Sequence, residues 1–239
     1  MIMKLDIPLL DLKQFVVRQL NNFFPDNNAV SVDEEFSLAF DRALERLENC
    51  FSHIVVNGYS IKEDGVDVPF FQHTNSDQYC QFLWFLSNTL WKMYPGKKDV
   101  CDKLILLNKM LHGCWFTYKV ELPDIFVVVH PVGSVIGHAY YSNYLVICQN
   151  VTIGQKEVGD LSHIGEYCFL GTGATIMGIC NIGDRTSLGI RATIYNEDLE
   201  EDSVVYIDKE TGRRTIYKNN SICRAKMYFD KNYHVIKGV

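Results

Sequence analysis

Aliphatic residues recur every six positions in the second half of the chain. From Ile164 the sequence divides without a gap into units that open on Ile or Leu and mostly carry glycine second: IGEYCF, LGTGAT, IMGICN, IGDRTS and LGIRAT, with Ile194 opening the next. A helix needs apolar positions three to four apart and a flat strand needs strict alternation, so this period fits neither. It is typical of a parallel β-helix, in which short strands stack coil on coil around inward aliphatic side chains. The glycines predict corners at which φ is positive.

The period continues less regularly towards the N-terminus. Counted back from Ile153, the units are VHPVGS from Val129, VIGHAY from Val135, YSNYLV and ICQNVT. Residues 154–163, GQKEVGDLSH, interrupt the count, and we expect them to form a loop that leaves an otherwise regular coil. After the repeat, VVYIDKETGRRTIYK predicts two strands joined by a turn at residues 210–213.

The first 120 residues carry the spacing of amphipathic helices instead. Ser31 and Glu34 have the spacing of a capping box, and Ser76 or Asp77 can cap a strongly apolar helix. The segment 57–74 contains glycine and proline and is expected to be a loop. The expected helices lie within residues 4–24, 31–50, 76–94 and 97–111.

These patterns together predict a chain of the α+β class. We expect an α-helical domain at residues 1–120, a β-helix at residues 121–210, and a hairpin with a tail at residues 211–239.

Composition narrows the possible partners. The net charge of −6 argues against nucleic acid or an anionic membrane as the main partner. No apolar run is long enough to span a bilayer. Asp6 and Asp11 interrupt the apolar N-terminus, unlike a signal peptide, so we expect a cytoplasmic protein.

The eight cysteines form no CxxC pair and are expected to be reduced thiols that fill apolar space. No cluster has metal-ligand spacing, so no metal is expected.

Three runs within the repeat carry a family resemblance: HPVGSVIG from His130, ICQNVTIG from Ile147 and LGTGATIMG from Leu170. They resemble the serine acetyltransferases, which are hexapeptide-repeat acyltransferases. The segment 121–126 and the helical half are similar to a branch of that family found with bacterial surface-polysaccharide genes. The resemblance covers roughly residues 80–210. It implies left-handed β-helices assembled as a homotrimer or a dimer of trimers, with acetyl-CoA bound as co-substrate between neighbouring coils.

His130 stands where that family keeps its catalytic histidine. A hydroxyl group is a poor nucleophile, and a positioned imidazole can take its proton as it attacks the thioester. The resemblance therefore implies O-acetylation of a small hydroxyl acceptor, either L-serine or a sugar, with His130 as general base. A backbone N–H of the coil would hold the oxyanion. An N-acetyltransferase acting on an amino sugar and a catalytically silent trimeric scaffold stay open as alternatives.

The sequence departs from the family at three positions. Val129 and Trp115 replace two aspartates, one of which orients the imidazole, and Asp160 replaces an arginine suited to the carboxylate of serine. We expect Glu121, Asp124 or a backbone carbonyl to hold the second ring nitrogen of the histidine instead. The loss of the arginine weakens the case for L-serine.

Two further histidines, His138 and His163, are candidates for contact with the acceptor.

The resemblance also assigns the residues of the cofactor groove. An arginine near the groove would pair with the CoA phosphates. The groove residues are Gly154, Gln155, Thr172 and Ile190, with Arg191 or Arg185 at the phosphates.

Overall fold

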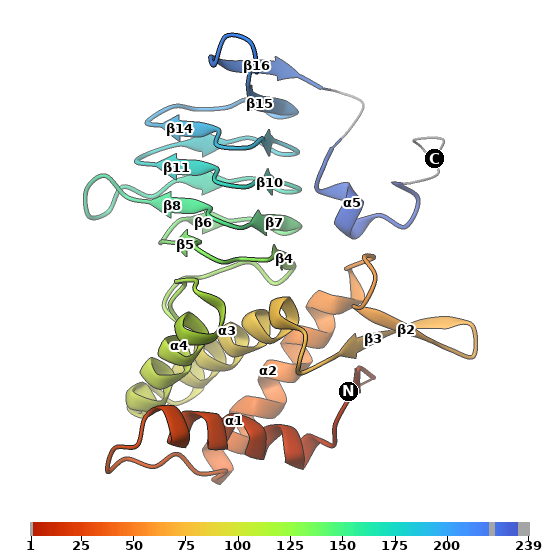
Figure 1. Cartoon of the computed structure of the whole chain (residues 1–239), viewed down its shortest axis with the longest axis vertical. Coiled ribbons are helices and arrows are strands. Elements are labelled where there is room, and N and C mark those ends of the chain that lie inside the picture. The colour runs from red at the N-terminus through yellow and green to blue at the C-terminus, as the bar shows by residue number, and fades with distance from the viewer. Residues whose placement is uncertain (1, 220–222, 234–239) are drawn as a thin grey trace. The chain divides into compact units, whose positions relative to one another are not determined.

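The computed structural model (Figure 1) describes residues 2–219 and 223–233 of the 239-residue chain. The chain divides into two compact units, one formed by Met1–Ser52 with Asn57–Lys119 and one by His53–Val56 with Val120–Val239. None of the helices in the described ranges combines the length and the apolar character that a bilayer crossing requires. The hairpin and tail expected at residues 211–239 include residues 220–222 and 234–239, which lie outside the described ranges.

The helical unit is built around α3 (Ser76–Met93), whose side chains are buried from residue 78 to residue 90. This helix packs against both α2 and α4, which explains why it is buried on all sides. Asn75 caps it: the side-chain oxygen of Asn75 accepts hydrogen bonds from the backbone N–H groups of Asp77 and Gln78. The other helices are α1 (Leu9–Phe23), α2 (Glu34–Ser52), η1 (Pro95–Lys97) and α4 (Lys98–His112), with α5 (Lys226–Phe229) in the second unit.

The segment expected to be a loop at residues 57–74 is a β-hairpin. Strands β2 (Ser60–Glu63) and β3 (Val66–Phe71) pair antiparallel. Asp64 and Gly65 join them with φ angles of 47° and 83°, the positive values that a type I′ turn requires. The Asp-Gly pair was the sequence signal for this hairpin, and it outweighs the proline within β3.

Two helices begin later than the sequence predicts. Residues Lys4 and Leu5 form β1 (Lys4–Leu5), which pairs in parallel with β3, so α1 starts only after Pro8. Helix α2 is capped by Asp33 rather than by Ser31, because the Asp33 carboxylate accepts a hydrogen bond from the Phe36 N–H at 2.8 Å. A carboxylate at this position also interacts favourably with the positive end of the helix dipole.

His112 ends α4 and makes the helical unit sensitive to acid. Its side chain is buried, and its Nδ1 lies 2.7 Å from the side-chain oxygen of Asn108. Burial lowers the pKa of His112 from 6.5 to about 4, which outweighs the attraction of a helix C-terminus for a cation. The folded chain therefore holds this imidazole neutral at pH values where the unfolded chain protonates it.

Stability is thus expected to fall as the pH drops from 6.5 towards 4, because the unfolded state then binds more protons. Protonation of this one group lowers the free energy of unfolding by up to about 3 kcal/mol. Urea unfolding of the wild-type chain and of His112→Gln at pH 7 and pH 4.5 measures it. The free energy of unfolding should decline less steeply in the variant, and parallel pH profiles would contradict the assignment.

The second unit contains the parallel β-helix that the six-residue period predicts (Figure 1). Its strands are β4 (Phe126–Val129), β5 (Val135–Ile136), β6 (Tyr140–Tyr141), β7 (Leu145–Cys148), β8 (Thr152–Gly154), β9 (His163–Ile164), β10 (Phe169–Leu170), β11 (Thr175–Met177), β12 (Asn181–Ile182), β13 (Ser187–Leu188), β14 (Thr193–Tyr195), β15 (Ser203–Ile207) and β16 (Arg214–Lys218). They form three sheets, ordered β16-β15-β13-β10-β7-β4, β14-β11-β8-β5 and β12-β9-β6. Strand β16 pairs antiparallel with β15, so the expected hairpin is present.

Each of the three sheets lines the interior with a column of aliphatic side chains, and from Ile164 to Ile194 these are the residues that open the sequence units. The aligned side chains are at most 5% exposed. The three interior columns are Val128, Ile147, Leu170, Leu188 and Val205; Ile136, Ile153, Ile176 and Ile194; and Ile164, Ile182 and Leu199.

The first two units are displaced by one residue from the expected register. The inward residues are Val128 and Ile136, each 1% exposed, rather than Val129 and Val135. Eight positions separate Val128 from Ile136, whereas the same interval in the next coil is six. The first corner therefore contains two additional residues, which a count based on a constant period does not detect.

The glycines in second place do not have positive φ, so that expectation was wrong. The left-handed residue is usually the fourth of a unit, as at Gly173 and Arg185, with φ angles of 71° and 58°. The second-place glycines instead face the backbone of the next coil. A Cβ on Gly183 would lie 2.3 Å from a backbone nitrogen, and one on Gly171 would lie 2.7 Å from a backbone oxygen. Close stacking of coils therefore requires these glycines.

Candidate active site

His130 directly follows β4 and opens the extended first corner of the β-helix. Its side chain is exposed, and its φ of 49° places it in the left-handed region. Along this edge the left-handed residue of each coil is, in turn, Gly133, Asn150, Gly173 and Arg191. His130 is a second left-handed residue, found only in the first coil of this edge among the described residues. A backbone outlier of this kind, outside the regular pattern, is typical of a functional position.

Hydrogen bonds to the next coil hold the corner in place. The buried Ser134 hydroxyl donates to the carbonyl of Cys148 at 2.9 Å and accepts from the Val151 N–H at 3.1 Å. The Asn150 N–H donates to the Val132 carbonyl at 2.9 Å. Gly133 has a φ of 78°, and a Cβ there would lie 2.1 Å from Asn150 Oδ1, so this position favours glycine. The exposed imidazole is therefore attached to a fixed stretch of backbone.

The two acidic residues expected to orient His130 belong to the segment that leads into β4. Glu121 and Asp124 are exposed and precede β4, whereas His130 follows that strand. A four-residue strand is about 13 Å long. Asp124 lines a shallow pocket with Ser142, Asn143 and Glu166, at the edge that joins β6 to β7. Asp124 therefore lies beyond the opposite end of β4 from His130, and the acceptor that holds the second ring nitrogen of the imidazole stays a prediction of the sequence.

The residues assigned to one cofactor groove lie on two edges of the prism. Thr172, Ile190 and Arg191 stack on the edge that carries His130, where the Arg191 N–H donates to the Thr172 carbonyl at 2.9 Å. Gly154 ends β8 and Gln155 follows it, on the opposite edge of the β5-β8-β11-β14 sheet, where the Gly154 carbonyl accepts a hydrogen bond from the Gly178 N–H at 3.1 Å. The groove as expected from sequence is therefore not assembled within one chain.

The two candidate arginines differ in their surroundings. Arg185 forms ion pairs with Asp202 at 2.7 Å and Glu201 at 2.6 Å, which raise the pKa of its guanidinium. Arg191 is exposed, and no carboxylate of the described residues forms an ion pair with it. Arg191 is therefore the cation available to a phosphate group on this edge.

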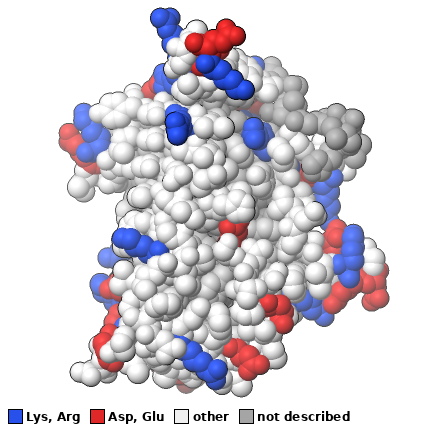
Figure 2. All heavy atoms as spheres, in the orientation of Figure 1, with Lys and Arg blue, Asp and Glu red and all other residues white. Residues whose placement is uncertain are grey.

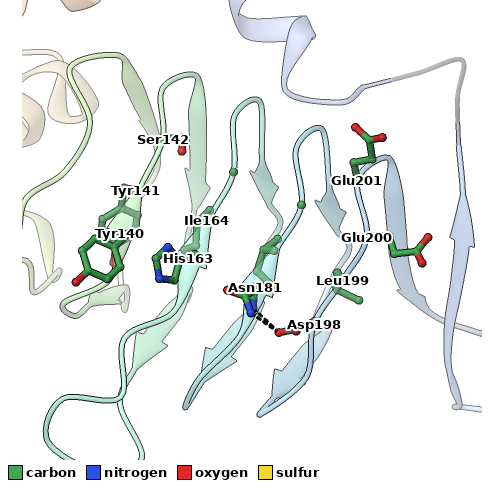
Figure 3. A pocket seen from close by; sticks show the side chains of 13 residues that line it. Tyr140, Tyr141, Ser142, His163, Ile164, Asn181, Asp198, Leu199, Glu200 and Glu201 are labelled. Atoms are coloured by element: carbon green, nitrogen blue, oxygen red, sulfur yellow. Dashed lines mark hydrogen bonds between the residues drawn. The ribbon is translucent and has the colours of Figure 1, made fainter.

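His163 lies on the third face of the prism, in a groove of about 640 Å³ over β6, β9 and β12 (Figure 3). Its ring stacks on Tyr140, with the centroids 4.4 Å apart. On the next coils the backbone and side-chain N–H groups of Asn181 both donate to Asp198 Oδ1, which lowers the pKa of Asp198. The result is a polar ladder along the solenoid axis that favours a hydroxylated or cationic molecule.

Sequence reasoning missed Tyr140, Asn181 and Asp198. Each directly precedes the inward residue of its coil, as His163 does, so a comparison of these equivalent positions would have found the ladder. His138 is exposed at the corner between β5 and β6, one corner after His130. The three candidate histidines thus occupy different parts of the prism surface.

The cysteines behave as apolar fillers. All eight are free thiols, and seven are buried. Burial raises the pKa of Cys101 and Cys168 to about 12, which keeps these thiols protonated at neutral pH. In the part of the chain that the structure describes, no group of three or more His, Cys, Asp or Glu side chains could hold a metal ion.

Comparison with known proteins identifies solved structures whose fold is similar to that of this chain. No protein-family profile and no curated protein sequence matches this chain. Among solved structures, a serine acetyltransferase in complex with cysteine matches 93% of this chain and 83% of its own, with a TM-score of 0.67 and 18% identity. The enzyme from Vibrio cholerae O1 biovar El Tor N16961 matches 92% of this chain and 84% of its own, with a TM-score of 0.65 and 19% identity.

A serine acetyltransferase in complex with CoA also matches, over 85% of this chain and 83% of its own, with a TM-score of 0.62 and 16% identity. The likeness extends through both the helical region and the solenoid. The expected fold class is thereby confirmed: the chain is an α-helical region followed by a left-handed parallel β-helix, with the fold of the serine acetyltransferases.

Proposed function

We propose that this protein is a CoA-dependent O-acetyltransferase in which His130 is the general base. The observation that carries the proposal is an exposed imidazole on the extended first corner of a β-helix with the serine acetyltransferase fold. One of the similar structures is a complex with CoA, which supports acetyl-CoA as the co-substrate.

The chemistry requires one proton transfer in each direction. The acceptor hydroxyl attacks the thioester carbonyl while the imidazole of His130 takes the hydroxyl proton. A new C–O bond forms, and backbone N–H groups of the coil stabilise the negative charge on the carbonyl oxygen. When this intermediate collapses, the C–S bond breaks and the imidazolium returns the proton to the sulfur of CoA.

The edge that carries His130 also offers a path for the cofactor. Thr172 and Ile190 follow on later coils, and Arg191 lies on the fourth coil. Coils are about 4.8 Å apart, so Arg191 is about 14 Å from the level of His130 along the axis. We assign the thioester to the His130 end and a CoA phosphate to Arg191, because guanidinium pairs strongly with phosphate.

In a homotrimer, the groove residues of the His130 edge would lie beside Gly154 and Gln155 of a neighbouring subunit. The strands of the β5-β8-β11-β14 sheet contain no charged residue, and charged side chains are sparse over this part of the β-helix (Figure 2). Val135, Ile179, Ile190 and Tyr195, on or beside this face, are 43% to 68% exposed. If subunits pack through this apolar face, the edge with Gly154 and Gln155 in one subunit lies beside the His130 edge of its neighbour.

The position of Asp160 favours a sugar over L-serine as acceptor. Asp160 lies in the loop between β8 and β9 and accepts a hydrogen bond from the Glu157 N–H, so the loop presents acids where a cation would be needed for the serine carboxylate. A neutral polyhydroxyl molecule has no such requirement. The role in surface-polysaccharide synthesis and the cytoplasmic location remain predictions of the sequence.

The direct test is release of the CoA thiol from acetyl-CoA in the presence of L-serine, neutral sugars and amino sugars. We expect thiol release with a sugar and a product that alkaline hydroxylamine cleaves, because an ester is cleaved and an amide is not. A hydroxylamine-resistant product would instead support N-acetylation. CoA at a hundred times its Kd should stabilise the folded chain by about 2.7 kcal/mol. Failure of both thiol release and stabilisation would identify a silent scaffold.

A further inference from the structure

The outer face of the sheet that contains β4, β7, β10 and β13 is covered by the chain's own C-terminal segment, residues 223–233. The Arg224 guanidinium lies 4.7 Å from the centre of the Phe169 ring, and the Tyr228 ring lies 6.3 Å from it. The Cys223 thiol donates to the Tyr167 carbonyl at 3.4 Å. Three outward side chains of this face, Val127, Val146 and Phe169, are at most 6% exposed.

One buried side chain on this face is polar. Ser187 aligns with Phe169 on one neighbouring strand and with Val204 on the other. It is 5% exposed, and its hydroxyl has no hydrogen-bond partner among the described residues. Burying a hydroxyl without a hydrogen-bond partner costs roughly 1–3 kcal/mol, so this hydroxyl lowers the stability of the fold unless a ligand bonds to it.

The hydroxyl borders a cavity of about 270 Å³ between β13, β15, β16 and the C-terminal segment. Its polar lining consists of Ser187, Asn219, Arg224 and two tyrosines, and its apolar lining consists of Val204 and Met227. The lining includes no carboxylate, and within the described residues Arg224 forms no ion pair. The cavity thus offers a guanidinium, hydroxyls and an amide beside an apolar wall.

We propose that this cavity is a binding site for a small organic carboxylate. The planar guanidinium of Arg224 matches the two oxygens of a carboxylate, and the Ser187 hydroxyl supplies a further donor. The volume lies just below the usual range for ligand pockets, which restricts the occupant to a molecule of a few carbon atoms. Its hydrocarbon part contacts Val204 and Met227.

The site is distinct from the candidate active site and does not depend on the proposed acetyl transfer. Strand β13, which carries Ser187, lies three coils from β4 and therefore about 14 Å from the level of His130 along the axis. Arg224 and Met227 belong to the C-terminal segment, so a bound carboxylate would hold this segment on the β-helix.

The test is titration of the full chain with sodium acetate, propionate, lactate and succinate, with sodium chloride at equal ionic strength as reference and inorganic phosphate as a competing anion. Calorimetry and thermal melting measure binding in the wild type and in Ser187→Ala, Arg224→Gln and Arg213→Gln. The last variant removes an exposed arginine from the turn between β15 and β16 and serves as the matched control.

We expect at least one carboxylate to bind and to raise the melting temperature of the wild type and of Arg213→Gln. Its Kd should increase by about tenfold or more in Ser187→Ala and in Arg224→Gln, since each variant removes a hydrogen bond to a charged group. Equal affinity in all four proteins would place the ligand elsewhere. Absence of carboxylate binding, or binding of phosphate alone, would overturn the assignment. Ser187→Ala is a conservative change that keeps the fold testable.

Discussion

Replacing His130 with alanine is expected to lower kcat for acetyl transfer by about 10²- to 10⁴-fold, which is the usual contribution of a general base. The reason is geometric, because the extended first corner presents the imidazole of His130 to solvent, beside the proposed thioester position. CoA should still stabilise the variant, because the groove residues on the later coils are unchanged. Steady-state thiol release and melting with CoA, measured on the same preparation, separate the two effects.

His73→Gln provides the control for this experiment. His73 belongs to the helical unit, where its Nδ1 lies 2.7 Å from the carboxylate of Asp6. Its replacement should leave the turnover number unchanged. If His130→Ala also turned over at the wild-type rate, the base would have to be another group. If His130→Ala lost CoA stabilisation as well, the imidazole would be a binding or structural group instead.

The β-helix is predictable from sequence because each coil needs one inward aliphatic residue per side, and this need imposes a fixed spacing. The prediction fails where a corner changes length. The first corner, which carries His130, holds two more residues than the corners above it, so the inward residues are Val128 and Ile136. The irregular corner that a period cannot describe is thus the one that carries the candidate base.

A change in loop length also explains why the residues assigned to the cofactor groove lie on two edges of the prism. Gly154 and Thr172 are 18 residues apart, the same interval that places Ile190 directly above Thr172. The loop between β8 and β9 adds five residues, so Gly154 aligns with Met177, 23 residues later. Spacing in the sequence therefore placed Gly154 on the wrong edge. Contacts such as the Ser187 cavity depend on where the C-terminal segment returns, and no local pattern encodes that return.

Replacing Ile176 with alanine is expected to lower the free energy of unfolding by about 2–5 kcal/mol. Ile176 is 1% exposed and lies between Ile153 and Ile194 in an interior column. Its removal leaves a cavity that the stiff coils above and below cannot fill, since their backbones are already in contact through glycine. Each coil of a solenoid contacts only its neighbours, so the loss acts on the interfaces at both sides of this coil.

Val158→Ala is the control, since Val158 is an aliphatic residue of the same unit but is fully exposed in the loop between β8 and β9. Its effect on the free energy of unfolding should stay within about 0.5 kcal/mol. Urea unfolding followed by circular dichroism compares the two variants with the wild type. A similar small effect at both positions would mean that the coil relaxes around the lost side chain, and the interior columns would then not set the stability of the prism.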